Sequence, residues 1–441
     1  MIRSILAGFG LFACLLTAKA QWVGGGSSGT TIHHQACAFH EVDTGLFVYG
    51  ANDPGQGAGG IIITWSGLVG SGGNIWSTSP GNLEDIDVRM GSNGRPIFLA
   101  AGHKQYNQSL VVYQYLAGGS AFDFESVLTG NNRYYRAIRM RSDIVAFAAG
   151  GNSSGDGIID MSIDTGFTWT NIAVLPGQPV SRLHFVNDQV GFAACGGYRR
   201  LFNNGVQLAD SGAIYRTVNG GLDWSPVHSS NITGFSDVAF LNDDIGVATR
   251  CDGAMLRTTD GGDTWIPTPV SISGSYVLTS VTFRPDGTGF AGCYRPDGTE
   301  GMILISEDEG FSWYENFSSS GVNHSRRIYD VYFFDNAHGY AATHIRPLRT
   351  DGIVMGVDGP ERTSFSLRPN PSTDEAVSVT LGGTNGSSLI ELIDPMGRVL
   401  RSLRVNDQPD VLLPVDGLRP GSYLIRVSNG AGIASRVLVR L

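Results

Sequence analysis

An eight-residue pattern, Ser/Thr-x-Asp-x-Gly-x-Thr-Trp, recurs along the chain and constrains its fold more than any other feature. Residues 258–265 show it as Thr-Thr-Asp-Gly-Gly-Asp-Thr-Trp. In such a stretch the Asp carboxylate can accept backbone N–H bonds inside a tight turn, the Gly can adopt a positive φ, and the Thr-Trp pair can re-enter a strand. We therefore predict a self-contained hairpin with the Trp ring packed beneath its turn.

Other copies of this octad lie before and after it. Residues 162–169 match it fully, residues 306–313 have Ser for Thr, residues 217–224 have Asn for Asp, and residues 73–76 keep only the Gly and the Trp. The structural residues expected from the four fuller copies are Asp164, Trp169, Asn219, Trp224, Asp260, Trp265, Asp308 and Trp313. The octads resemble the Asp-box, also called the BNR repeat, of sialidases and of the propellers related to photosystem assembly factors.

A second signature, an apolar strand followed by a polar turn and Gly-aromatic-Ala, precedes the boxes and is weaker in the first three units. Its marker position moves through residues 45, 94, 146, 191, 246, 289 and 339. A period of about 50 residues with four short strands per unit is typical of a β-propeller. The 61 glycines and the charged fraction of 16% fit many turns between short strands. We predict an all-β fold, a seven-bladed β-propeller followed by a small C-terminal β-sandwich.

The seventh unit has a degenerate box at residues 349–352 and lacks the Trp. A strand from the N-terminal end of the chain would complete this unit and remove an exposed sheet edge. We expect residues 21–23 to close the ring in this way and Trp22 to supply the missing ring.

The first 20 residues have the character of a secretory leader. Arg3 precedes an apolar run over residues 5–16, and Ala18-Lys19-Ala20 forms an A-x-A cleavage site. No other segment approaches the about 20 apolar residues that a membrane span needs. The formal charge of −10 argues against a general nucleic-acid or anionic-membrane binder.

Four cysteines follow the leader, namely Cys37, Cys195, Cys251 and Cys293. Two bridges among them would allow three connectivities. The last three cysteines fall at equivalent points of successive units, which should lie further apart than the roughly 7 Å between Cα atoms that a disulfide allows. Buried thiols are therefore predicted. The cysteine spacing is unlike that of a zinc site, and we expect neither a metal nor a cofactor.

The composition changes near Gly359 and Pro360, and residues 365–441 alternate strands with Gly-bearing turns, which predicts a small β-sandwich. This tail resembles the type A C-terminal sorting domain of the type IX secretion system of Bacteroidetes-like bacteria. The resemblance rests on residues 369–371 (Pro-Asn-Pro), on a D-x-x-G-R turn at residues 394–398, on G-L-x-x-G-x-Y at residues 417–423, and on a basic-apolar ending. That ending has Arg where the family usually has Lys.

The expected domain plan is a signal peptide at residues 1–20, an Asp-box propeller at 21–358, a linker at 359–364 and a sorting domain at 365–441. The resemblance implies export through the periplasm and the outer membrane, with the type IX machinery as the partner of residues 365–441. It also implies that the tail is usually removed and that the protein is often attached to the cell surface. We expect a secreted or surface-displayed bacterial protein.

Successive turns of an antiparallel meander alternate between the two faces of the ring. The boxes join the third and fourth strands, so the opposite face carries the loops between strands 2 and 3 and between successive units. In sialidases that opposite face holds the active site. Positive and aromatic residues gather in these loops: Arg133, Tyr134, Tyr135, Arg136, Arg182, Tyr198, Arg199, Arg200, Arg295, Arg326, Arg327 and Arg346.

Converging arginines with flanking tyrosines suit an anionic glycan or an acidic peptide of a protein ligand. The alternative is solvated loop charge paired with neighbours such as Asp237, Asp297 and Asp330. The resemblance to sialidases does not extend to their catalytic residues, an Arg-Ile-Pro motif, an Asp acid/base and a Tyr-Glu nucleophile pair. Residues 95–97 read Arg-Pro-Ile, the wrong order, and no loop Tyr has a Glu assignable as its partner from sequence.

We therefore predict a non-catalytic binding module with no catalytic residues. The alternative is an exo-acting, sialidase-like glycoside hydrolase. An assembly factor like the photosystem-related propellers is a third class, which shares the repeats but not the sorting tail.

Overall fold

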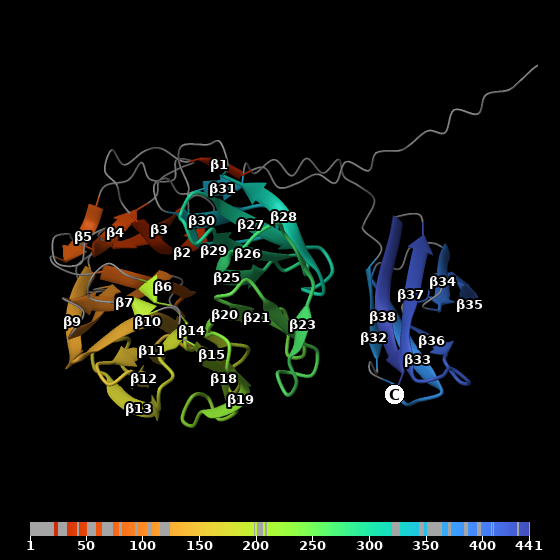
Figure 1. Cartoon of the computed structure of the whole chain (residues 1–441), viewed down its shortest axis with the longest axis horizontal. Helices are drawn as coiled ribbons and strands as arrows, with labels where there is room; N and C mark the ends of the chain where they lie inside the picture. The colour runs from red at the N-terminus through yellow and green to blue at the C-terminus, as the bar shows by residue number, and fades with distance from the viewer. Residues whose placement is uncertain are drawn as a thin grey trace, which may run out of the picture. The chain divides into compact units, whose positions relative to one another are not determined.

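The computed structural model of the chain is built from β-strands (Figure 1). It describes residues 22–24, 33–41, 44–50, 59–63, 74–78, 82–92, 96–104, 108–114, 124–197, 199–200, 206–207, 210–319, 327–343, 348–350, 364–368, 372–382, 387–394, 398–406, 408, 410–429 and 432–440. Every regular element among these residues is a strand, which confirms the all-β class. Within the same residues no helix is long and apolar enough to cross a membrane.

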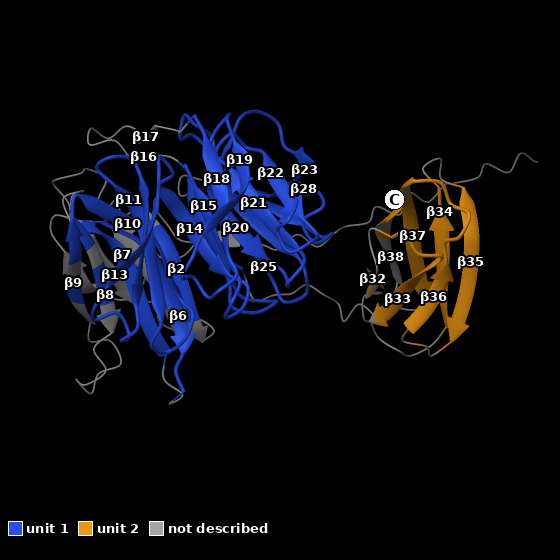
Figure 2. Ribbon diagram, turned by 90° about the horizontal axis from the view of Figure 1, so that it is seen from below, with its two compact units in different colours: residues 1–353 blue, residues 354–441 orange. Residues whose placement is uncertain are grey.

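The chain divides into two compact units, residues 1–353 and 354–441 (Figure 2). The division falls a few residues before the expected linker at 359–364, whose residues lie outside those described. The expected signal peptide also lies outside them.

The described strands of unit 1 form seven four-stranded antiparallel meanders, numbered here 1 to 7 in chain order, of which the first two are joined into one sheet by pairing of Gly50 with Asn82. Meander 1 contains β2 (His33–Glu41), β3 (Thr44–Gly50), β4 (Gly59–Ile63) and β5 (Asn74–Thr78), and meander 2 contains β6 (Asn82–Met90), β7 (Pro96–Lys104), β8 (Gln108–Gln114) and β9 (Phe124–Asn131). Meander 3 contains β10 (Arg133–Met140), β11 (Ala146–Asn152), β12 (Gly157–Ser162) and β13 (Thr170–Leu175), and meander 4 contains β14 (Val180–Phe185), β15 (Gly191–Cys195), β18 (Gly212–Thr217) and β19 (Ser225–Ser230).

Meander 5 contains β20 (Phe235–Phe240), β21 (Gly246–Arg250), β22 (Met255–Thr258) and β23 (Ile266–Thr268). Meander 6 contains β25 (Val277–Phe283), β26 (Gly289–Tyr294), β27 (Gly301–Ser306) and β28 (Trp313–Ser318), with β24 (Val270–Ser271) added in parallel to β28. Meander 7 contains β29 (Ile328–Phe333), β30 (Gly339–Thr343), β31 (Leu348–Thr350) and β1 (Trp22–Gly24). A short hairpin of β16 (Arg199–Arg200) and β17 (Val206–Gln207) extends from meander 4.

The meanders surround a common centre, with the first strand of each on the inside (Figure 1). These first strands contact one another in the cyclic order β2, β6, β10, β14, β20, β25, β29 and back to β2. Apolar clusters lie between neighbouring meanders and contain residues of both. One of them includes Phe147 of meander 3 and Leu183 of meander 4. Each meander therefore completes its core only through its neighbours, as propeller blades do.

The N-terminal strand β1 closes the ring. It pairs antiparallel with β31, with Trp22 opposite Thr350 and Gly24 opposite Leu348. The expected closure by the N-terminal end is confirmed, and the strand covers residues 22–24 where 21–23 was expected. The Trp22 side chain lies outside the described residues, so its role stays a prediction.

The four fuller Asp-boxes share one hydrogen-bond pattern, shown here for meander 5. Asp260 Oδ1 accepts the Thr264 N–H (2.9 Å), and Thr258 Oγ1 accepts the Gly262 N–H (2.9 Å), where Gly262 has a φ of +87°. The Trp265 indole N–H donates to the Gly262 carbonyl (3.1 Å), and its ring is 7% exposed. The predicted hairpin chemistry is confirmed.

The Asn for Asp exchange in meander 4 is matched by a second exchange in the same box. The Asn219 amide N–H donates to Asp223 Oδ2 (2.8 Å), whereas in meander 5 the Thr264 hydroxyl donates to Asp260 Oδ2 (2.5 Å). Donor and acceptor have changed places between the third and seventh positions of the octad, so the turn keeps its hydrogen bond.

We expect Asp260→Ala to lower the free energy of unfolding by about 1–2 kcal/mol, because the Thr264 N–H and two hydroxyls lose their acceptor. Asp260→Asn combined with Thr264→Asp copies the pair of meander 4 and should restore most of that loss. Urea denaturation of the three proteins measures both effects. A double variant as weak as Asp260→Ala would contradict this account of the box.

Unit 2 contains two antiparallel sheets that share one apolar core. One sheet has the order β32 (Ser364–Arg368), β33 (Ala376–Gly382), β36 (Asp410–Pro414), and the other has the order β35 (Val399–Asn406), β34 (Ser387–Ile393), β37 (Gly421–Asn429), β38 (Gly432–Arg440). Val377 and Leu413 of the first sheet belong to the same buried cluster as Ile390 and Ile425 of the second. At the two ends of the D-x-x-G-R motif, the Asp394 carboxylate accepts the Arg398 backbone N–H (2.9 Å).

The four described cysteines, Cys37, Cys195, Cys251 and Cys293, are all buried free thiols, as predicted. Among the described residues no group of three or more His, Cys, Asp or Glu side chains could hold a metal ion.

Candidate binding site on the ring axis

A β-bulge interrupts the first strand of every meander at the same place. In each case the pairing with the second strand skips one residue, and the skipped residues are Gln35, Glu84, Arg136, Ser181, Ser236, Thr279 and Tyr329. A bulge leaves its extra residue unpaired and re-aims its side chain. These seven residues, together with Arg182, line a single small cavity, and all of them are buried. The fold thus brings one bulged side chain from each meander to the axis.

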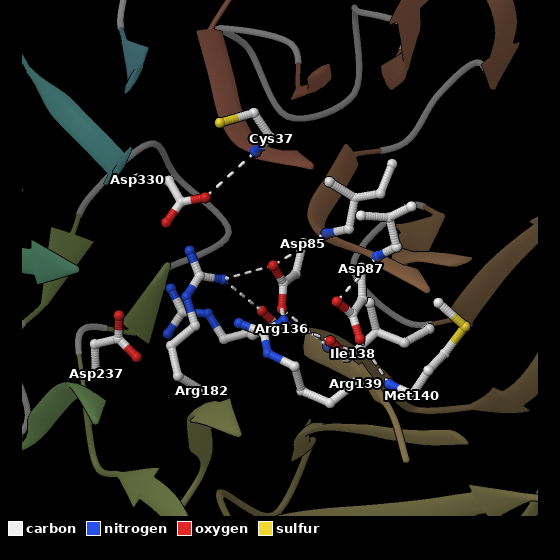
Figure 3. A network of polar contacts seen from close by, with 12 residues as sticks. Cys37, Asp85, Asp87, Arg136, Ile138, Arg139, Met140, Arg182, Asp237 and Asp330 are labelled. Atoms are coloured by element: carbon white, nitrogen blue, oxygen red, sulfur yellow. Dashed lines mark hydrogen bonds and ion pairs between the residues drawn. The ribbon is translucent and has the colours of Figure 1, made fainter. Parts of the chain in front are cut away.

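The residues that follow the bulges tie the meanders together (Figure 3). Asp85 of meander 2 accepts the Ile138 N–H of meander 3 (3.0 Å). Asp237 of meander 5 accepts the Val281 N–H of meander 6 (2.9 Å), and Asp330 of meander 7 accepts the Cys37 N–H of meander 1 (3.3 Å). Three junctions around the axis are therefore held by carboxylates.

Other polar side chains hold three further junctions. Arg182 Nη1 donates to the Arg136 carbonyl (3.1 Å) between meanders 4 and 3. His184 Nε2 accepts the Phe240 N–H (3.2 Å) between meanders 4 and 5, and the Thr279 hydroxyl donates to the Ile328 carbonyl (2.8 Å) between meanders 6 and 7. The axis is thus a polar seam, in which these six side chains form hydrogen bonds across meander boundaries.

The charges on the axis are mixed. Arg139 Nη1 lies 2.6 Å from Asp85 Oδ2, and Arg182 Nη1 lies 3.5 Å from Asp85 Oδ1. Burial raises the pKa of Asp237 to about 7, although the nearby Arg182 opposes the shift. Burial likewise lowers the pKa of His184 to about 4, assisted by Arg139. His184 is therefore neutral at pH 7, which lets its Nε2 accept a hydrogen bond.

The axial cavity is small and polar. About 20 Å³ is open to the centre of a water molecule, which is room for one or two waters or for the tip of a ligand. The Gln35 side-chain amide nitrogen is buried and has no hydrogen-bond partner among the described residues. The bulges lie near the starts of the first strands, so the cavity lies toward the ring face opposite the Asp-boxes. We call the loops around the cavity on that face the mouth; among the described residues they include Tyr276, Arg295 and Arg327.

The residues that the sequence analysis placed in these loops have different positions in the structure. Arg136 and Arg182 come together in the cavity. Arg133 and the Tyr135 hydroxyl both bind Asp160 inside meander 3, and Tyr135 is fully buried, so both are engaged within their own meander. The half-buried Tyr134 ring lies edge-on to His103 at 6.3 Å.

Two mouth arginines lie on aromatic rings. The Arg295 guanidinium lies 5.1 Å from the Tyr276 ring centre, and that of Arg327 lies 5.3 Å from the Tyr294 ring centre. Tyr294 in turn contacts Tyr329 of the cavity, with ring centres 6.3 Å apart. Tyr198, Arg326, Arg346 and the side chains of Arg199 and Arg200 lie outside the described residues.

Two aspartates expected as surface partners of the loop arginines have other positions. Asp237 is buried on the axis, and Asp330 binds the Cys37 N–H there, because both follow a bulge and not a loop. Asp297 binds the Thr299 hydroxyl (2.6 Å) within its own turn.

A Tyr-Glu pair that the sequence did not reveal is present in meander 6. The Tyr276 hydroxyl donates to Glu300 Oε2 (3.2 Å), and Arg295 Nε donates to the same oxygen (2.7 Å). Ser318 and Arg295 hold the pKa of Glu300 below its usual value, while burial raises the pKa of Tyr276. With Tyr276 only 3% exposed, the pair joins two loops and has the character of a structural contact more than of an activated nucleophile.

Sequence reasoning also missed most of the cavity. Gln35, Glu84, Ser236, Thr279 and Tyr329 stand in first strands that also contain other polar residues, so polarity alone did not single them out. Each bulged residue lies ten positions before the marker of its unit, so a polar residue at this offset in every repeat was the available signal.

Comparisons with known proteins place the fold. No protein-family model matches the chain, and no curated protein matches it. Among solved structures it is similar to YCF48 from Cyanidioschyzon merolae, with a TM-score of 0.51, 13% identity, and coverage of 75% of this chain and 98% of that one. It is also similar to YCF48 bound to D1 peptide, with a TM-score of 0.35, 15% identity, and coverage of 75% and 96%.

A third similar structure is the extracellular domain of the one-component system BT4673 from B. thetaiotaomicron, with a TM-score of 0.49 and 10% identity. The match covers 96% of this chain and 57% of that one. The first of the three similarities, read with the meanders of unit 1, shows a YCF48-like β-propeller fold.

Proposed function

We propose that this chain is a seven-bladed propeller that binds an acidic glycan or protein ligand without catalysis, through the axial cavity and its mouth. The observation that carries the proposal is the convergence of seven bulged residues on one cavity with Arg136, Arg182 and the unpaired Gln35 amide. Such converging polar groups in a concave site are what ligand recognition requires.

The size of the cavity limits what can enter it. A carboxylate at the end of a ligand fits the room of one or two waters and can accept hydrogen bonds from Gln35 and the guanidinium groups. The remainder of the ligand would lie over the mouth, against Arg295 and Arg327. Because the carboxylates of Glu84, Asp85 and Asp330 equal the axial guanidinium groups in number, we expect moderate affinity that falls with added salt.

Gln35→Leu is the sharpest test of this site. We expect about tenfold weaker binding, because donors to a charged group are lost, with unchanged or higher stability, because the amide nitrogen has no partner in the ring. The mature chain is screened on arrays of acidic glycans and acidic peptides, and the best binder is titrated. Gln189→Leu on the opposite face is the matched control and should bind normally. Equal affinity of Gln35→Leu and the unaltered protein would place the ligand elsewhere.

The second candidate is an exo-acting glycoside hydrolase, whose support is the hydrogen bond between Tyr276 and Glu300 (3.2 Å), with the burial of Tyr276 standing against it. Fluorogenic glycosides offered to the mature chain decide the question. Turnover that is abolished by Glu300→Gln, with folding intact, would replace the binding proposal by this one.

We also propose that residues 365–441 export the propeller through the type IX secretion machinery to the cell surface or the medium. The support is the sorting-domain motifs and a core of its own in unit 2, since domains with separate cores fold independently. Deleting residues 365–441 should leave a folded propeller in the periplasm. Immunoblots of cell fractions and medium measure this, and normal levels of the truncated protein in the medium would rule the proposal out.

A further inference from the structure

Six exposed apolar side chains lie in or beside the turns at the Asp-box end of meanders 2 to 4. They are Met90, Ile144, Ile163, Phe167, Val218 and Leu222, with exposed fractions of 47–64%. The last four occupy the second and sixth positions of the boxes in meanders 3 and 4, between the residues that build the turn. We call these six residues the apolar row.

The turns that carry the apolar row are tied to one another. Asp143 of meander 3 accepts the Ser92 N–H of meander 2 (2.7 Å), and the Thr165 N–H donates to the Ile144 carbonyl (3.1 Å). The Arg141 guanidinium binds the Gly220 carbonyl of meander 4. The six side chains therefore stand on one connected surface.

The fold does not require apolar residues at these positions. The same two positions of the octad hold Thr259 and Asp263 in meander 5, and in meander 6 the second position holds Glu307 while the sixth is again an exposed apolar residue, Phe311. Because polar residues serve equally well in the same turns, the apolar row is a property of this surface and not of the box. Grouped exposed apolar residues of this kind mark interaction sites.

The part of the face beside the apolar row is acidic. The turns of meanders 5 and 6 contain Asp243, Asp244, Asp260, Asp263, Asp286, Glu307, Asp308 and Glu309, against Arg216, Arg257 and Arg284 in or beside them. Asn187 of meander 4 donates to Asp243 of meander 5 (3.2 Å), and Arg216 pairs with Asp263 (2.6 Å). The apolar and acidic parts are therefore continuous.

We infer that the Asp-box face docks a protein segment in which apolar residues stand beside lysines or arginines. The apolar residues of the segment would cover the apolar row, which removes apolar surface from water, and its cations would lie over the acidic turns of meanders 5 and 6. This face is opposite the axial mouth, so the propeller would bind two partners at once.

Two labelled peptides of equal length and charge test the inference by fluorescence anisotropy with the mature chain. One alternates leucine with arginine and the other alternates serine with arginine. The leucine peptide should bind about tenfold more tightly or better, and added salt should weaken both peptides. Equal affinities would overturn the inference, because charge alone would then account for binding.

Variants locate the peptide on the molecule. Phe167→Ser with Leu222→Ser should cost the leucine peptide about tenfold in affinity and leave the serine peptide unchanged. Ile163→Ser with Val218→Ser repeats the test if the first pair fails to fold. Val174→Ser with Ile232→Ser removes apolar residues of similar exposure at the opposite end of meanders 3 and 4, near the end of β13 and after β19, and is the control. A loss in the control as large as in the test variants would overturn the inference.

Discussion

Replacing Asp85 by alanine should lower the free energy of unfolding by about 3–5 kcal/mol, the largest loss expected for any single substitution on the axis. The carboxylate is 1% exposed, accepts the N–H groups of Ile86 (3.0 Å) and Ile138 (3.0 Å), and lies beside the guanidinium groups of Arg139 and Arg182. Removing one partner of a buried ion pair leaves the other partners charged and uncompensated, which costs more than the pair itself contributes.

Two further variants separate this mechanism from a simple packing defect. Asp85→Ala with Arg139→Met removes one stranded charge and should recover part of the loss. Asp143→Ala removes an exposed pair with Arg89 and the acceptor of the exposed Ser92 N–H, which water can replace, and should change stability far less. Urea denaturation of the four proteins gives the comparison. A loss for Asp85→Ala no larger than for Asp143→Ala would show that the axial network contributes little.

The sequence predicted those parts of the fold whose chemistry is local. Residues 258–265 contain every atom of their own hairpin, so the Asp, Gly and Trp positions could be assigned without knowledge of the rest of the chain. The degenerate last box likewise indicated that another strand must complete meander 7, and Trp22–Gly24 does so. The repeats strengthened both predictions, because each unit contains the same arrangement of strands and turns.

The site was harder to predict because it arises from the ring and not from any one unit. Loop position alone placed Arg133 beside Arg136 as a ligand-binding residue, yet a bulge turns Arg136 to the axis while Arg133 binds Asp160 of its own meander. Gln35 and Thr279 share in the sequence only their polarity and their position ten residues before the marker of the unit, and it is ring closure that brings them into one cavity.

The same reasoning applies to the charges. Nothing in the sequence around Asp237 distinguishes it from an exposed aspartate. It is buried because the first strand of meander 6 packs beside it, and it accepts the Val281 N–H of that strand. Asp237, which the sequence analysis considered as a partner of loop arginines, is thus a buried acceptor of a hydrogen bond between meanders 5 and 6. That position also changes its proton affinity, which gives the fold a measurable dependence on pH.

Asp237 should make the ring less stable as the pH rises from about 4 to 7. Burial raises its pKa to about 7 in the folded chain, against about 3.9 when unfolded. Across this window the unfolded chain releases the proton while the folded chain retains it, so folding loses up to about 4 kcal/mol of stability by pH 7, with little further change above it. His184, whose folded pKa is about 4, acts in the opposite direction, because protonation below about pH 6.5 favours the unfolded chain.

Comparison with Asp237→Asn isolates the first effect, because His184 titrates in both proteins. The asparagine amide nitrogen cannot accept the Val238 or Val281 N–H, so the variant carries a cost at every pH. Only the pH dependence of the difference is therefore diagnostic. Denaturation at several pH values from 4 to 8 should show the advantage of the unaltered protein shrinking by up to about 4 kcal/mol as the pH rises. A difference that stays constant would mean that Asp237 keeps an ordinary pKa and that the polar seam holds it fully charged.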